Sequence, residues 1–134
     1  MPASEQPATG LRAGEVTAAR FLLAASVVLV GYLAVVPLDL PQLTGADDKV
    51  GHLAAFAGLA FLADFAFPAC RYGVAKWLPL VAYGATIEGV QYFLPHRSFS
   101  LLDLAADALG LLLYGAGVPL LRRLPILRRR WAHG

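Results

Sequence analysis

Acidic, basic and amide residues occur in pairs inside the apolar stretches of this sequence. The members of each pair lie three or four residues apart: Asp48 with His52, Glu88 with Gln91, and Asp103 with Asp107. Residues at these spacings share one face of a helix. A histidine beside carboxyl groups can transfer protons, and the same groups can bind a polar head group or a cation. The chemistry open to these residues therefore depends on the elements that position them.

The chain is too apolar for a small soluble domain. Its 134 residues are 58% hydrophobic and 15% charged, against roughly 45–50% and about 25% in ordinary soluble domains. A soluble domain of this length could not bury so many apolar side chains, because small globules leave much of their surface in water. The net charge of +2 is weak support for nucleic-acid binding, and the single cysteine, Cys70, excludes an intramolecular disulfide. We predict one membrane domain that binds no nucleic acid.

Four long apolar runs predict an all-α integral membrane bundle of four transmembrane helices. Eighteen helical residues rise about 27 Å, which is close to the thickness of a bilayer core. A closed β-barrel needs more strands than this length allows, and a soluble bundle would show a polar face on each helix, which the first run lacks. The predicted spans are about 21–38, 50–67, 77–94 and 101–121.

The remaining segments are predicted to flank a single transmembrane domain over residues 18–121. Residues 1–17 are rich in Pro, Ala, Thr and Gly and predict a flexible N-terminal lead, and residues 122–134 form a basic cytoplasmic tail. A cleaved signal peptide is the alternative for the first run, since Arg12 and Arg20 precede it. That run is long for a signal peptide, and no A-x-A site follows it.

Lysine and arginine predict the orientation. With four spans, both termini and the 68–76 connection lie on one side and carry nine of the eleven basic residues, whereas the other side holds only Lys49 and Arg97. The positive-inside rule then places both termini in the cytoplasm. We interpret the arginines of the tail as topology determinants that meet anionic lipid heads, with a protein or nucleic-acid target as the alternative.

This topology brings the polar residues to one level of the membrane. The second helix enters from the outer side, the third leaves toward it and the fourth begins there, so all three deliver polar side chains near the outer face. Gly84, Gly110 and Gly117 lie on the same helix stripes, and small residues permit close helix approach. The predicted cluster comprises Asp48, Lys49, His52, Glu88, Gln91, Arg97, Asp103 and Asp107.

The ordered fragments of this cluster resemble a known family. Asp48-Lys49-x-x-His52, Glu88-x-x-Gln91 and Pro95-x-Arg97, followed by Asp103 and Gly110, are similar to the VanZ-like membrane protein family. The resemblance covers roughly residues 48–117, about half of the chain and three of the four helices. It implies a multi-pass protein of the bacterial inner membrane, linked to low-level resistance to teicoplanin, a lipid-bearing glycopeptide, or to envelope maintenance.

Two positions depart from the pattern of that family. Asp107 stands where asparagine is usual, and His96 stands where glycine is usual. Asp107 adds a carboxyl group four residues from Asp103, and two close carboxyl groups can share a proton because like charges disfavour joint ionisation. Hydrogen bonding by a neutral amide therefore does not carry over from the family to Asp107.

Each polar residue also has a structural interpretation. Lys49 can extend to the interface, Arg97 can anchor the outer connection, and Gln91 can link two helices. His52 can donate to a helix carbonyl, and Glu88 can pair with a nearby cation. Asp64 lies toward the cytoplasmic end and is predicted to pair with Arg71 or Lys76.

Three functions remain open. The favoured one is a binding module for the head group of an amphiphile in the outer leaflet. In it Arg97, Lys49 and His52 would contact an anionic group, and Glu88, Asp103 and Asp107 would orient those cations or take amine and hydroxyl groups.

The second function is a structural or accessory subunit of a larger membrane complex, in which the cluster only locks helices together. The third is an enzyme acting on lipid-linked head groups, with His52 and the carboxyl groups as acid and base or around a hard divalent ion. The sequence has no HExxH motif and no nucleophile elbow, and Ser98 and Ser100 are nucleophiles only in the loosest sense. We therefore assign no catalytic residue, metal or cofactor.

Overall fold

The computed structural model describes residues 9–37 and 45–132, and it confirms that the chain is all-α. Four long helices are followed by one short 3-10 helix: α1 (Ala13–Val35), α2 (Gly45–Ala66), α3 (Val74–Tyr92), α4 (Leu101–Leu121) and η1 (Arg128–Trp131). Helix α4 has the predicted bounds, whereas α1, α2 and α3 begin eight, five and three residues before the predicted starts and end one to three residues before the predicted ends. Residue 38, the predicted end of the first span, and residues 1–8 of the predicted lead lie outside the described residues.

Helix α1 begins inside the segment that the sequence predicts to be a flexible lead. Residues 13–17 are helical, because the Arg12 backbone N–H donates to Glu15 Oε2 at 2.8 Å in a capping box. Arg129 of the C-terminal segment donates to the other Glu15 oxygen at 2.6 Å. The prediction of a lead up to residue 17 is therefore wrong for residues 13–17, and the helix start is fixed by a tertiary contact.

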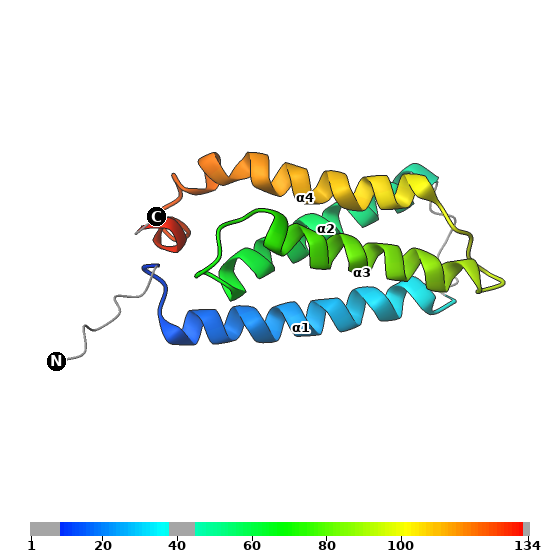
Figure 1. Ribbon diagram of the computed structural model, residues 1–134, viewed down its shortest axis with the longest axis horizontal. Helices are drawn as coiled ribbons and strands as arrows, with labels where there is room; N and C mark the ends of the chain where they lie inside the picture. Colours follow the sequence, from blue (N-terminus) through cyan, green and yellow to red (C-terminus); the bar gives the residue numbers. More distant parts are fainter. Residues whose placement is uncertain (1–8, 38–44, 133–134) are drawn as a thin grey trace.

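The four helices run in alternating directions along one long axis, as Figure 1 shows. The core lies among α2, α3 and α4, with Phe56 and Leu59 of α2, Leu80 of α3, and Leu111 and Tyr114 of α4 buried against one another. Helix α1 lies against the side of this group through partly buried residues such as Leu23 and Val27. It leaves most of its large apolar side chains exposed, which suits a lipid surround.

Three of the four helices are long and apolar enough to cross a membrane. They are α1, α4 and the part of α2 from Ala46 to Ala66. Helix α3, which has 19 residues and carries Lys76, Glu88 and Gln91, is not among these three. The chain is thus a multi-pass membrane protein by the length and composition of these helices.

Glycine permits the closest helix contacts at two of the three predicted positions. A Cβ at Gly110 would collide with the backbone of α2 at Leu53, and one at Gly84 would lie 2.8 Å from Asp107 Oδ2. At Gly117 nothing lies within 4 Å of such a Cβ. The prediction of close approach is confirmed for Gly84 and Gly110 and is wrong for Gly117.

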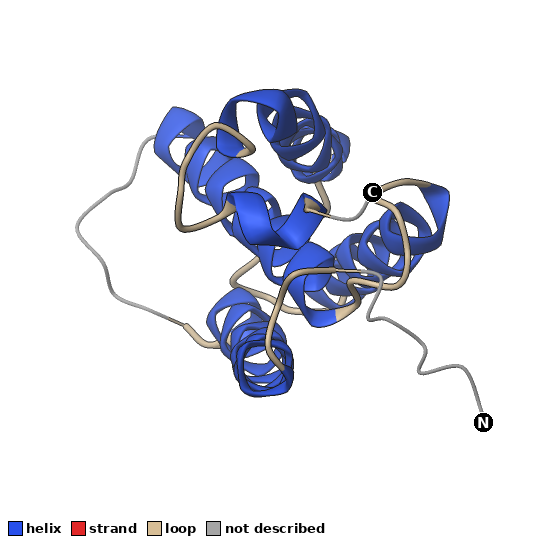
Figure 2. Cartoon of the chain, turned by 90° about the vertical axis from the view of Figure 1, so that its left-hand side faces the viewer, coloured by secondary structure: helices blue, strands red, loops and turns tan. Residues whose placement is uncertain are grey.

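The C-terminal segment returns to the bundle instead of extending from it. In the end view of Figure 2, η1 lies across the end of the bundle that holds the start of α1. Gly10 N donates to the Arg129 carbonyl at 2.9 Å, and the Thr9 hydroxyl donates to the Arg130 carbonyl at 3.1 Å. The ring of Trp131 meets that of Phe65 edge to face at 5.9 Å. These contacts join both ends of the described chain at one end of the molecule.

Candidate functional site

The described residues form two polar clusters, one at each end of the helix bundle. The first, which we call the His52 cluster, lies where α2 and α4 begin and α3 ends, and contains Asp48, Lys49, His52, Glu88, Asp103 and Asp107. The second, which we call the Asp64 network, lies where α2 ends and α3 begins, and contains Asp64, Lys76, Tyr114 and Arg130. They differ in how completely their polar atoms are paired.

His52 lies between the two aspartates of α4. Its Nδ1 atom is 2.9 Å from Asp107 Oδ1, and its Nε2 atom is 3.9 Å from Asp103 Oδ2. The other Asp103 oxygen, Oδ1, accepts from Lys49 Nζ at 3.3 Å. The two carboxyl groups therefore contact basic side chains of α2, and not each other as the shared-proton prediction required. Helix spacing explains the arrangement, since each pair presents one side chain per turn to the facing helix.

Glu88 connects α3 to the first turn of α4. Its Oε2 atom accepts from the Ser100 backbone N–H at 2.9 Å, and Ser100 Oγ accepts from the Asp103 backbone N–H at 3.2 Å. Ser100 is thus the N-cap of α4, which satisfies a backbone donor that the helix itself cannot pair. The Ser100 hydroxyl is therefore engaged as a helix cap and is not positioned as a nucleophile toward the cluster.

Two buried carboxylate oxygens of the cluster have no partner among the described residues. They are Glu88 Oε1 and Asp107 Oδ2. Glu88 is fully buried, and Asp107 is 2% exposed. Buried polar atoms are nearly always hydrogen-bonded, and leaving one unpaired costs about 1–3 kcal/mol. The cluster is therefore incomplete within the described part of the chain.

The charges of the cluster are unequal. It holds four carboxyl groups and only two basic groups, Lys49 and His52, each of which already faces Asp103 or Asp107. Carboxylates therefore outnumber cations at this end of the bundle. Such a site favours a group that brings positive charge or hydrogen-bond donors.

Two of the predicted cluster residues lie elsewhere. Gln91 Nε2 donates to the Ala34 carbonyl at 3.0 Å, and Arg97 Nη2 donates to the Leu33 carbonyl at 3.1 Å. His96 Nε2 adds a contact of 2.9 Å to the Val35 carbonyl. These carbonyls belong to the last turn of α1, where no intrahelical donor remains. Gln91 thus links two helices, as its structural interpretation predicts, and Arg97 caps α1 instead of lining the cluster.

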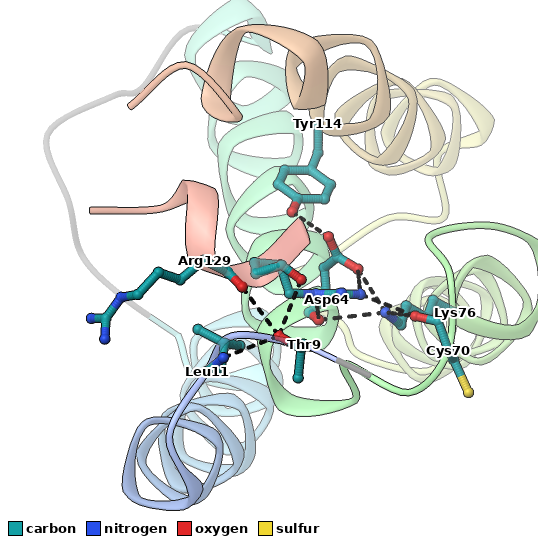
Figure 3. Close-up of polar contacts among 8 residues, drawn as sticks. Thr9, Leu11, Asp64, Cys70, Lys76, Tyr114 and Arg129 are labelled. Atoms are coloured by element: carbon teal, nitrogen blue, oxygen red, sulfur yellow. Dashed lines mark hydrogen bonds and ion pairs between the residues drawn. The ribbon is translucent and has the colours of Figure 1, made fainter. Parts of the chain in front are cut away.

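The Asp64 network is fully paired and buried (Figure 3). Asp64 Oδ1 accepts from Lys76 Nζ at 2.6 Å and from Arg130 Nη2 at 2.8 Å, and Oδ2 accepts from the Tyr114 hydroxyl at 2.8 Å. Lys76 and Arg130 also donate to the Cys70 carbonyl. The predicted pairing of Asp64 with Lys76 is confirmed, and Arg71 is exposed.

Sequence reasoning missed Arg130. It is one of three consecutive arginines, and the residue type alone does not distinguish it from Arg128 or Arg129. The available signal was Trp131, since an aromatic residue after a polar run indicates a return to the interface. Arg130 is 5% exposed and also donates through Nε to the Asp64 carbonyl at 2.7 Å. This arginine is therefore part of the packed structure and not a charge presented to lipid heads.

An aromatic pair covers this network from the connection between α2 and α3. The Tyr72 ring meets the Tyr114 ring edge to face at 4.8 Å, and the Tyr72 hydroxyl donates to the Leu111 carbonyl at 2.7 Å. Burial raises the pKa of Tyr72 to about 12. Each side chain of the Asp64 network thus has a structural contact, whereas the His52 cluster holds two buried carboxylate oxygens without a partner among the described residues, so we take the His52 cluster as the candidate functional site.

No family model, curated protein or solved structure matches this chain. The resemblance to the VanZ-like family accordingly rests on the residues of the sequence alone.

Proposed function

We propose that this chain is a four-span, VanZ-like protein of the bacterial inner membrane that binds the head group of an amphiphile at the His52 cluster. The observation that carries the proposal is the pair of buried oxygens, Glu88 Oε1 and Asp107 Oδ2, that lack partners among the described residues. A bound head group would supply the missing donors.

The contacts favour a head group with an amine or with hydroxyl groups over an anionic one. Lys49 and His52 already face aspartates, and Arg97 caps α1, so the three cations expected to hold an anion are engaged. The unpaired atoms are carboxylate oxygens, which accept hydrogen bonds and attract cations. A lipid head group with an amine or with hydroxyl groups fits this chemistry. The family resemblance adds lipid-bearing glycopeptides such as teicoplanin to the candidate ligands.

The position of the cluster supports binding from the outer leaflet. The opposite end of the bundle carries the start of α1, the 67–73 connection and η1, with most of the arginines of the described chain. The positive-inside rule assigns that end to the cytoplasm.

A crossing by α3 is compatible with its charged residues. Its 19 residues rise about 28 Å, close to the thickness of a bilayer core. Lys76 pairs with Asp64, and Glu88 is buried against the start of α4, so neither side chain faces lipid.

Lipid selectivity of the purified protein tests the proposal. We expect native mass spectrometry in detergent to show preferential retention of phosphatidylethanolamine over phosphatidylcholine and phosphatidylglycerol of the same acyl chains. The amine of the first lipid donates hydrogen bonds, the trimethylated amine of the second does not, and the third has no amine. The loss of one charge-assisted hydrogen bond costs about 1.5–3 kcal/mol, so Glu88→Gln and Asp107→Asn should each lower this preference about tenfold or more.

Glu15→Gln is the matched control, because Glu15 is a carboxyl group at the other end of the bundle. It should retain the preference of the wild type. Equal retention of the three lipids, or the same selectivity in Glu88→Gln as in the wild type, would contradict amine recognition. A preference for phosphatidylglycerol, whose head group has hydroxyl groups and no amine, would also contradict amine recognition.

A further inference from the structure

Three side chains of the His52 cluster are of types that bind metal ions, and they lie close together. Asp48, His52 and Asp103 each offer one ligand atom, and these atoms all lie within 4.8 Å of one another. Asp48 and His52 are one turn apart on α2, and Asp103 belongs to the first turn of α4. Both helices begin at this end of the bundle, so the start of α4 and the first few turns of α2 bring the three groups together.

The orientation of His52 leaves its second ring nitrogen available. A carboxylate oxygen, Asp107 Oδ1, accepts from Nδ1 at 2.9 Å, so in the neutral ring Nε2 carries the lone pair. This lone pair faces Asp103 Oδ2 at 3.9 Å, which is too long for a hydrogen bond. Two ligand bonds of about 2.0–2.2 Å at the tetrahedral angle place their ligand atoms roughly 3.3–3.6 Å apart, so a movement of a few tenths of an ångström by the Asp103 carboxyl group brings both atoms to one ion. A ligating histidine held by a carboxylate at its other nitrogen is the usual arrangement in metal sites.

The remaining contacts of the group agree with this assignment. Lys49 lies at Asp103 Oδ1, so the other oxygen of that carboxylate, Oδ2, can turn to an ion. The Asp103 backbone is held by the Ser100 cap. Behind His52, the buried Asp107 contacts Nδ1 through Oδ1, and its Oδ2, which lies toward Gly84 of α3, has no partner among the described residues. An unbalanced carboxylate charge at one ring nitrogen of His52 favours a cation at the other ring nitrogen.

The geometry points to a divalent metal site formed by Asp48, His52 Nε2 and Asp103 Oδ2, with Asp107 as the residue that orients His52. One imidazole and two carboxylates suit zinc better than magnesium or calcium, which prefer oxygen ligands alone. Three protein ligands leave a coordination position open for water or a polar group. This inference needs only the ligand geometry, so it stands whether or not a head group binds.

Zinc titration of the full chain tests the inference. The protein is purified without a histidine tag in a non-ionic detergent without added lipid, and Zn²⁺ is titrated against a chromophoric chelator. We expect one ion per chain in the wild type. His52→Ala and Asp48→Asn should weaken binding more than tenfold, and Asp107→Asn should weaken it roughly 10–100-fold, as loss of an orienting partner does. Equal Mg²⁺ should not displace the zinc.

His96→Ala is the matched control, because His96 contacts the Val35 carbonyl outside the cluster. It should bind zinc as the wild type does. Asp48 is only half-buried, so Asp48→Asn gives an answer even if His52→Ala does not fold. Absence of stoichiometric zinc in the wild type, or unchanged affinity in Asp48→Asn, would overturn the metal site. Since no lipid is present, that result would leave the lipid selectivity untouched.

Discussion

Replacing Asp64 with alanine should destabilise the protein by about 3–5 kcal/mol, the cost of removing one partner from a buried ion pair. The substitution leaves Lys76 and Arg130 buried without their carboxylate and removes the acceptor of the Tyr114 hydroxyl. Because Arg130 belongs to η1, the C-terminal segment should also separate from the bundle. Unfolding of the purified protein in mixed detergent micelles, followed by circular dichroism, measures the loss of stability.

Glu15→Ala is the control for the Asp64 substitution. It breaks the ion pair between Glu15 and Arg129, the residue next to Arg130, but both side chains of that pair are more than a third exposed. Exposed pairs contribute about 0–1 kcal/mol, and the capping bond that Glu15 accepts from the Arg12 N–H contributes roughly 0.5–2 kcal/mol, so Glu15→Ala should lose less stability than Asp64→Ala. Equal losses in Asp64→Ala and Glu15→Ala would contradict the structural role of the Asp64 network.

Replacing Gly110 with alanine should separate α4 from α2 and lower stability by about 1–3 kcal/mol or more. The new Cβ would collide with the Leu53 carbonyl oxygen and would lie 3.0 Å from the Ala57 backbone nitrogen. Backbone atoms in a helix cannot move aside as the end of a side chain can. The His52 cluster lies within two turns of Gly110 on these helices, so the same unfolding assay should detect a loss of cooperativity as well as of stability.

Gly117→Ala provides the comparison on the same helix. An added Cβ at this position has nothing within 4 Å, and alanine is a better helix former than glycine by about 1 kcal/mol. This variant should be neutral or slightly stabilising. If Gly110→Ala were as stable as Gly117→Ala, the close α2–α4 contact would be wrong.

Much of the fold could be predicted from the sequence, because hydropathy identifies apolar helices and helix spacing identifies faces. The convergence of His52, Asp103 and Asp107 followed from these two facts alone. Successive helices run in opposite directions, so polar residues at the end of one helix and at the start of the next lie at the same level of the membrane. The i, i+4 spacing then places both aspartates on the face of α4 that meets His52.

The partners of long, flexible side chains could not be predicted in this way. Arg97 lies in a short connection, and nothing in the sequence distinguishes an anion from the free carbonyls at the end of α1 as its target. Arg130 pairs with a residue more than sixty positions away, across a turn whose path depends on packing. The early start of α1 likewise depends on Arg129, which is distant in the chain. Such contacts depend on the tertiary fold and cannot be predicted from the local pattern of the sequence.

Labelling of single cysteines in cells tests the central claim, that the His52 cluster and the Asp64 network lie at opposite faces of the membrane. The native Cys70 is exposed in the connection before α3, and Ser98 is exposed in the connection after it. A membrane-impermeant maleimide should label Ser98→Cys in a Cys70→Ser background in intact cells. It should label the wild-type Cys70 only after permeabilisation. Labelling of both cysteines from the same side would show that α3 does not cross the membrane, and the reverse pattern would place the cluster in the cytoplasm.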